Sequence, residues 1–142
     1  MTGQVRFIGV VESVGEPQRV RIHQEFCSGL KGVEGFSHLI ILYWFHLRDN
    51  EEDRRVLRVV PRRRPHAPLV GVFASRSPSR PNPIGLCVVR LIRVEGCTLY
   101  VRGLDAFEGS PILDIKPYLP DSDAVPEAVV PAWVGRGRGE AR

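Results

Sequence analysis

The stretch Ile84-Gly-Leu-Cys-Val-Val-Arg-Leu-Ile-Arg-Val-Glu-Gly-Cys-Thr-Leu-Tyr-Val-Arg102 decides the fold class of this chain. Apolar and β-branched residues fill both of its halves, which is typical of strands. Glu95-Gly96 lies between the halves and supplies a tight turn. The stretch therefore predicts a long antiparallel hairpin.

Further segments of the same kind lie on both sides of this hairpin. Strands are predicted at 5–11, 19–23, 37–46, 70–73 and 112–115, and helical turns only within 27–35 and 50–56. Prolines and glycines separate many short elements. The fold class is thus all-β and mainly antiparallel, with the strands forming a closed or nearly closed barrel.

The chain length and the local composition predict one domain followed by an extension. At 142 residues the chain suits a single domain, placed over residues 1–120. Residues 121–142 form a C-terminal extension that is expected to be partly disordered, and its last stretch, Gly135-Arg-Gly-Arg-Gly-Glu-Ala-Arg, is expected to be a mobile tail. The basic, proline-rich segment 58–68 is expected to be irregular.

Charge and cysteine usage narrow the functional classes. The formal net charge is +4, and Lys31 and Lys116 are the only lysines. Arginine suits phosphate groups and base edges, although a coding bias explains the excess equally well. No apolar run is long enough to cross a bilayer and no secretory signal is visible, so a cytoplasmic protein is predicted. Three cysteines without CxxC spacing predict neither a disulfide framework nor a metal site.

The segment 74–86 is the first candidate for a functional site. Its prolines at positions 78, 81 and 83 fix the backbone before any ligand binds. Arg76, Arg80 and Asn82 lie within this rigid frame and suit anionic or polar groups. Gly85 permits a close approach where the next strand begins. A surface loop stiffened only for stability is the alternative.

A second polar cluster follows the hairpin. Asp105 comes just after a strand, where a barrel rim would present it. Asp114 and Lys116 are two residues apart on an extended segment and therefore share one face, so they are expected to pair. An Asp-x-Lys pair is more often a surface ion pair than a catalytic pair.

These motifs together resemble the TsaA-like family, whose characterised members are the TrmO tRNA methyltransferases. The resemblance extends from about Phe7 to Pro120. It is carried by Gly9-Val10, Gly29-Leu-Lys-Gly-Val-Glu-Gly-Phe-Ser-His, Leu42-Tyr-Trp-Phe-His, Gly71-Val-Phe-Ala-Ser-Arg-Ser-Pro-Ser-Arg-Pro-Asn-Pro-Ile-Gly-Leu, Gly103-Leu-Asp and Asp114-Ile-Lys-Pro-Tyr-Leu-Pro.

The resemblance implies a single-sheeted β-barrel that binds S-adenosylmethionine and works as a homodimer. It implies N6-methylation of threonylcarbamoyladenosine (t6A) beside the anticodon of tRNA. The spacing of cysteines and histidines and the short apolar runs predict no metal and no membrane partner. By their positions in the motifs, the implied cofactor contacts are His46, Leu47, Arg76, Leu86, Arg102, Gly103, Leu104 and Asp105.

The chemistry of methyl transfer suggests further roles. The N6 of t6A belongs to a urea and is a poor nucleophile, so a base that removes its proton would help. Asp105 or Asp114 is the candidate base, with Lys116 or Tyr118 orienting the carbamoyl oxygen.

Substrate contacts are predicted from the types of residue that grip an anticodon loop. Arg80, Asn82, Arg62 and Arg63 are the candidates, although the arginine run 62–64 is equally consistent with a solvated connection. Phe73 and Phe107 are stacking candidates or core residues. Tyr43, Trp44 and Phe45 are interpreted most simply as core or dimer interface.

Two departures from longer relatives leave alternatives open. Those relatives carry a Pro-Arg-Gln in a long loop between the first two strands, which is shortened here to Val14–Arg19, and a C-terminal domain beyond the matched region. Loosely similar residues persist at Pro17, Gln18 and Arg19. The rival hypotheses are a non-enzymatic S-adenosylmethionine-binding module, a methyltransferase with another acceptor, and an anion-binding barrel.

Overall fold

The computed structural model describes residues 1–135, and the predicted mobile tail lies largely outside them. The chain forms two compact units. Among the described residues, the barrel unit consists of Met1–His46 and Ile84–Tyr118, and the loop unit consists of Leu47–Pro83 and residues 119–135. The sequence-based division at residue 120 stays a prediction.

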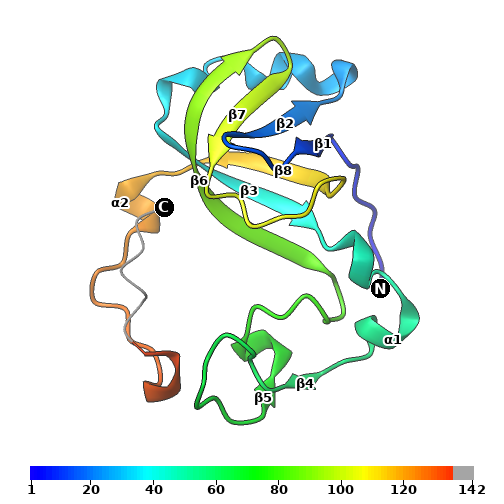
Figure 1. The fold of residues 1–142 in the computed structure, drawn as a ribbon, viewed down its shortest axis with the longest axis vertical. Coiled ribbons are helices and arrows are strands. Elements are labelled where there is room, and N and C mark those ends of the chain that lie inside the picture. The colour runs from blue at the N-terminus through cyan, green and yellow to red at the C-terminus, as the bar shows by residue number, and fades with distance from the viewer. Residues whose placement is uncertain (136–142) are drawn as a thin grey trace. The chain divides into compact units, whose positions relative to one another are not determined.

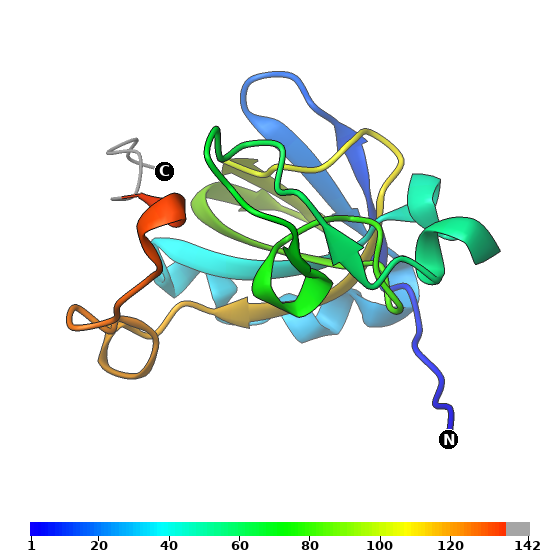
Figure 2. The ribbon, with the colours of Figure 1, turned by 90° about the horizontal axis from the view of Figure 1, so that it is seen from below.

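The barrel unit is a closed, wholly antiparallel β-barrel, which confirms the predicted fold class (Figure 1). Its strands are β1 (Gly9–Ser13), β2 (Gln18–Ile22), β3 (His38–Trp44), β6 (Ile84–Glu95), β7 (Thr98–Arg102) and β8 (Pro111–Pro117). They close in the order β1-β2-β7-β6-β3-β8. The predicted hairpin is β6–β7, and the short β1–β2 hairpin is seen in blue in Figure 2.

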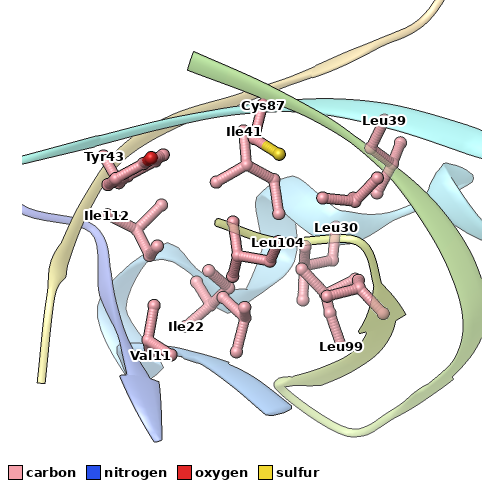
Figure 3. Packing of buried hydrophobic residues seen from close by; sticks show 13 residues of the cluster. Val11, Ile22, Leu30, Leu39, Ile41, Tyr43, Cys87, Leu99, Leu104 and Ile112 are labelled. Carbon is pink, nitrogen blue, oxygen red and sulfur yellow. The ribbon is translucent and has the colours of Figure 1, made fainter. Parts of the chain in front are cut away.

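The core of the barrel follows from strand alternation. In β3, Leu39, Ile41 and Tyr43 are buried, whereas Ile40 and Leu42 between them are half-buried and point outward. The same alternation in the other strands fills the interior, as Figure 3 shows. The inward-facing residues of the other strands are Val11, Val20, Ile22, Cys87, Val89, Leu99, Val101 and Ile112.

A disulfide joins the connection after β2 to the β6–β7 turn, so the prediction from cysteine spacing was wrong. Cys27 lies in the 3-10 helix η1 (Gln24–Leu30), and Cys97 is 70 residues away in sequence. Their Cα atoms are 5.4 Å apart. The Ile22 N–H donates to the Cys97 carbonyl at 2.8 Å, which brings the two segments together. Sequence spacing could not reveal this neighbourhood because it arises from strand pairing.

The other short elements lie in connections. The 3-10 helix η2 (Val33–Gly35) follows η1, and η3 (His46–Arg48) follows β3. The loop unit contains α1 (Glu51–Arg54), β4 (Arg58–Val59), β5 (Val70–Gly71), η4 (Val72–Ala74), α2 (Pro120–Asp123) and η5 (Ala132–Val134). β4 pairs with β5, so the segment expected to be irregular begins with a two-residue strand.

No helix among residues 1–135 is both long and apolar enough to span a membrane.

Gly85 is placed where a neighbouring side chain leaves no room for a Cβ atom. Gly85 pairs with Tyr43 across β3 and β6. A Cβ atom on Gly85 would lie 2.5 Å from Tyr43 Cζ and 2.9 Å from Phe45 Cζ. The two rings contact each other edge to face, with centroids 5.3 Å apart. The close approach predicted for Gly85 is therefore the approach of the Tyr43 ring.

We predict that Gly85→Ala lowers the free energy of unfolding by about 1–3 kcal/mol, because both rings must shift to admit a methyl group. Urea denaturation measures the change. Gly29→Ala is the matched control, since no neighbouring atom lies within 4 Å of its added Cβ. An unchanged denaturation midpoint for Gly85→Ala would contradict the packing described.

Candidate functional site

The segment Arg102–Asp105 turns inward after β7 and covers one end of the barrel core. Leu104 is 5% exposed and belongs to the core cluster, whereas Arg102, Gly103 and Asp105 are exposed. Figure 3 shows the Leu104 side chain pointing into the cluster. Gly103 has φ +88°, a conformation that favours glycine. One buried side chain thus anchors a segment whose neighbouring residues face outward.

Inward-facing side chains from two strands hold the centre of this segment. Gln18 of β2 donates from Nε2 to the Leu104 carbonyl at 2.8 Å, and its Oε1 accepts from the Leu104 N–H at 3.3 Å. The buried Cys87 thiol of β6 donates to the Gly103 carbonyl at 2.9 Å. These contacts satisfy backbone groups that burial would otherwise leave without partners.

Two further side chains hold the ends of the segment. The Tyr43 hydroxyl, at the last inward position of β3, donates to the Asp105 carbonyl. Arg102 Nε contacts Glu16 Oε1 at 2.8 Å, but both side chains are largely exposed, so this ion pair contributes little to stability. All four residues predicted by resemblance in this segment therefore have side-chain or backbone anchors.

His46 lies beside the loop that follows this segment. It is half-buried, and a Cβ atom built on Gly109 would lie 3.9 Å from its Nε2. The Gly109 N–H donates to the Val11 carbonyl at 2.8 Å, which ties the loop to β1. The barrel unit thus carries His46 near residues 105–110.

The outer face of the barrel brings together other predicted residues. Leu42 pairs with Leu86 on one side and with Asp114 on the other. Leu86 is 46% exposed. Lys116 Nζ lies 3.4 Å from Asp114 Oδ2, which confirms the predicted pair. Both of these side chains are at least half exposed, so this is a surface ion pair.

Tyr118 follows β8 and lies against His38 of β3. The two rings are edge to face with centroids 6.5 Å apart, and the Tyr118 N–H donates to the His38 carbonyl at 3.1 Å. Asp114, Lys116 and Tyr118 therefore lie at alternate positions along β8 and just beyond its end. Asp105 lies in a different place, in the segment that Tyr43 anchors from inside the barrel.

In the loop unit, hydrogen bonds stiffen the proline-rich segment 75–83. Ser75 Oγ accepts from the Ser77 N–H, and Ser77 Oγ accepts from the Ser79 N–H, each at 3.3 Å. Ser79 Oγ donates to Asp53 at 2.6 Å. Hydrogen bonds from Ser79 and then Asn50 hold the pKa of Asp53 below its ordinary value. The rigid frame predicted from the prolines is thus reinforced by local side chains.

The arginines of this segment differ in their surroundings. Arg80 Nη1 donates to the carbonyls of Ser75 and Ser77, each at 3.1 Å, so its guanidinium closes its own loop. Asn82 Oδ1 accepts from Arg54 at 3.4 Å. Arg76 is exposed. The predicted substrate roles of Arg80 and Asn82 stay predictions, and the structure gives each a structural contact.

Other predicted contact residues lie on the surface. Leu47, Arg62 and Arg63 are exposed residues of the loop unit. Phe73 is 80% exposed and Phe107 is 70% exposed, so the core alternative for these rings is wrong. Phe73 lies in the 3-10 turn η4, which the strand predicted over 70–73 did not reveal, and Phe107 lies in the loop after Asp105.

A separate pocket of about 370 Å³ lies on the barrel unit between η1 and β8. Ile8, Ile22, Phe26, Leu30 and Ile115 give it an apolar lining, with Glu25, Ser28, Gly29 and Asp114 completing it. Of the predicted site residues, only Asp114 lines this pocket.

Sequence reasoning missed the anchoring residues. The sequence indicates only a loose likeness of Gln18 to a loop motif, and for Tyr43 it indicates a core or dimer-interface position. Gln18 lies on the same inward-facing row as Val20 and Ile22, the buried residues of β2. A polar group at the end of an inward-facing row needs a buried partner, and that signal could have identified both residues.

The comparisons with known proteins agree on one family. The model of the tRNA-methyltransferase O N-terminal domain matches residues 11–124. A probable S-adenosyl-L-methionine-binding protein of Methanothermobacter thermautotrophicus is 48% identical over 110 residues, covering 78% of this chain and 75% of the relative. An S-adenosyl-L-methionine-binding protein of Archaeoglobus fulgidus is 48% identical over 106 residues, covering 75% of this chain and 72% of the relative.

A solved structure extends the agreement to three dimensions. The crystal structure of TrmO from Pseudomonas aeruginosa superposes with a TM-score of 0.71 at 33% identity, covering 91% of this chain. The match covers 61% of the TrmO chain, a little under two thirds of its length. Since the family model covers most of this sequence and relatives share nearly half of the aligned residues, the chain belongs to the TrmO family.

Proposed function

We propose that this chain is an S-adenosylmethionine-dependent methyltransferase that methylates N6 of t6A beside the anticodon of tRNA. The observation that carries the proposal is the anchored segment Arg102–Asp105 at the barrel end, followed at once by the exposed Phe107 ring. A polar backbone that is held in place before the ligand binds suits a cofactor, and an exposed aromatic ring suits stacking on an unstacked base.

The residues at the barrel end fit the chemical groups of S-adenosylmethionine. Gly103 has no side chain to obstruct a close approach, and the exposed Asp105 carboxylate is an acceptor for hydroxyl or ammonium groups. Leu86, on the outer face of the barrel, offers exposed apolar surface. The named relatives from two archaea are S-adenosyl-L-methionine-binding proteins, one of them described as probable, which supports the same cofactor here.

The chain's own residues supply alignment and proton removal. Bound S-adenosylmethionine would supply an electrophilic methyl group on its sulfonium. The protein must then hold the acceptor nitrogen in line and accept its proton. Asp105 or Asp114 is proposed as that base, with Lys116 or Tyr118 orienting the carbamoyl oxygen. Lys116 Nζ lies 3.4 Å from Asp114 Oδ2, so these two proposed side chains stand next to each other.

The proposed RNA partner is supported by exposed cationic and aromatic groups. Arg62 and Arg63 are exposed, and the chain carries a net charge of +4. Phosphate contacts from such arginines provide affinity without base specificity, whereas exposed rings such as Phe73 stack on unpaired bases.

We also propose a homodimer in the cytoplasm. Ile84 and Leu86 are 40% and 46% exposed on the outer face of the barrel. Covering this apolar surface with a second copy would remove it from water. Sedimentation should then give twice the chain mass of 15.9 kDa, and a monomer at micromolar concentration would contradict the dimer.

A second candidate function is a regulatory module that binds S-adenosylmethionine without transferring the methyl group. The names of the archaeal relatives, which mention binding alone, favour it. The two candidates share the cofactor and differ in turnover.

Calorimetric titration tests the cofactor. We predict micromolar binding of S-adenosylmethionine by the unaltered chain, weakened roughly tenfold or more by Arg76→Ala through loss of a charged contact. Arg58→Ala, another exposed arginine of the loop unit, is the control and should bind normally. Absence of binding by the unaltered chain would exclude both candidate functions.

Transfer of radiolabelled methyl from S-adenosylmethionine to tRNA with and without t6A tests the reaction. We predict label only in t6A-containing tRNA, and a loss in kcat of about a hundredfold when the base is replaced, in either Asp105→Asn or Asp114→Asn. Asp121→Asn on α2 is the matched control. Cofactor binding without transfer would support the binding module, and normal kcat in both variants would exclude both carboxylates as the base.

A further inference from the structure

Gln18 makes a two-point contact with the segment Arg102–Asp105. Its amide bonds both the N–H and the carbonyl of Leu104, at 3.3 Å and 2.8 Å. Cys87 and Tyr43 each reach one carbonyl, those of Gly103 and Asp105. Gripping both polar groups of one residue fixes the two peptide planes that flank Leu104.

The position of Gln18 follows from the strand pattern. It pairs with Val101 across β2 and β7, and lies on the same inward-facing row as Val20 and Ile22. Val101 and Val20 are fully buried, whereas Gln18 is half-buried at the end of the row. An apolar residue would satisfy the core at this position but would leave the Leu104 backbone without this partner.

We propose that Gln18 is a positioning residue for the cofactor. By fixing the peptide planes around Leu104, it orients Gly103 and Asp105, the exposed neighbours that face the cofactor. This inference rests on the proposed function, because it concerns binding of S-adenosylmethionine at this segment. Gln18 itself need not touch the cofactor, since both ends of its amide are engaged with the backbone.

The amide chemistry provides a test that a general loss of stability would not mimic. In Gln18→Glu, the neutral carboxylic acid can donate to the Leu104 carbonyl and accept from its N–H, as the amide does. The carboxylate cannot donate, and it faces a carbonyl oxygen. We call the pair of hydrogen bonds between side chain 18 and the Leu104 backbone the clamp. In this variant the clamp is therefore present at low pH and lost as pH rises through the carboxyl pKa, which is ordinarily about 4.3 and is raised by the facing carbonyl.

Because charged groups lie near Gln18, the variant must be compared with the unaltered chain at each pH. Glu16 and Arg102 form an ion pair beside Gln18, Arg19 follows it in sequence, and Asp105 follows Leu104. All of these groups are present in the unaltered chain and in the variant alike. The informative quantity is accordingly the ratio of the two dissociation constants for S-adenosylmethionine at the same pH.

We predict that Gln18→Glu binds S-adenosylmethionine about tenfold more weakly than the unaltered chain at about pH 8, and within about threefold at about pH 5. Calorimetric titration measures both. Gln4→Glu, an exposed glutamine in the same unit, is the matched control and should give a ratio near one throughout. A ratio for Gln18→Glu that stays constant with pH, whether high or near one, would overturn the proposal.

Two further measurements separate the possible failures. If the unaltered chain does not bind S-adenosylmethionine, the proposed function fails independently of Gln18. Amide hydrogen exchange of Leu104 then reads the clamp directly: protection in the unaltered chain should fall in Gln18→Leu, which has no acceptor for the Leu104 N–H, while core amides such as that of Val20 stay protected. Should Gln18→Glu fail to fold, Gln18→Asn, which keeps the amide but shortens its reach, should lose affinity at every pH, and normal affinity would overturn the proposal.

Discussion

The hydrogen bonds from inward-facing side chains to the backbone of Gly103, Leu104 and Asp105 are the interactions on which the rest of the barrel end depends. A strand alternates between the interior and the exterior, so its first and last inward positions lie where the barrel opens. Gln18 occupies such a position on β2 and Tyr43 on β3, and both carry polar groups that need partners. The chain satisfies them with the backbone of the segment that closes the opening.

This arrangement connects the most distinctive sequence motif to the site through packing. Gly85 leaves space for the Tyr43 ring, and the Tyr43 hydroxyl holds the Asp105 carbonyl. Two residues along β6, the Cys87 thiol holds the Gly103 carbonyl. The glycine at the end of the motif and the inward-facing thiol just after it thus shape a segment many residues later in the chain. In the loop unit, Arg80 stiffens its own loop in a comparable way, through backbone carbonyls.

Much of the fold was predictable from the sequence because strand alternation is a local pattern. The β6–β7 hairpin, the barrel class and the Asp114–Lys116 pair all follow from residues close in sequence, and the structure confirms them. The Cys27–Cys97 disulfide and the Gln18–Leu104 contact span 70 and 86 residues. Such contacts depend on which strands become neighbours, and no local pattern encodes that. The exposure of Phe73 was missed for a related reason, since a 3-10 turn interrupts the alternation there.

The candidate site was predictable in part, and only through resemblance. Motif positions identified Arg102–Asp105 without indicating why that backbone is held in place. The structure supplies the physical reason, which is a set of side chains that bind the segment from inside the barrel. A site of this construction should require little rearrangement when its ligand binds.

A crystal structure with S-adenosylhomocysteine, the demethylated product, would test this central claim most directly. We expect the nucleoside to contact the backbone of residues 103–105, which should move by less than about 1 Å, with the Gln18 amide still bonded to Leu104. A ligand bound elsewhere, or a segment that rearranges and releases Gln18 on binding, would contradict the account.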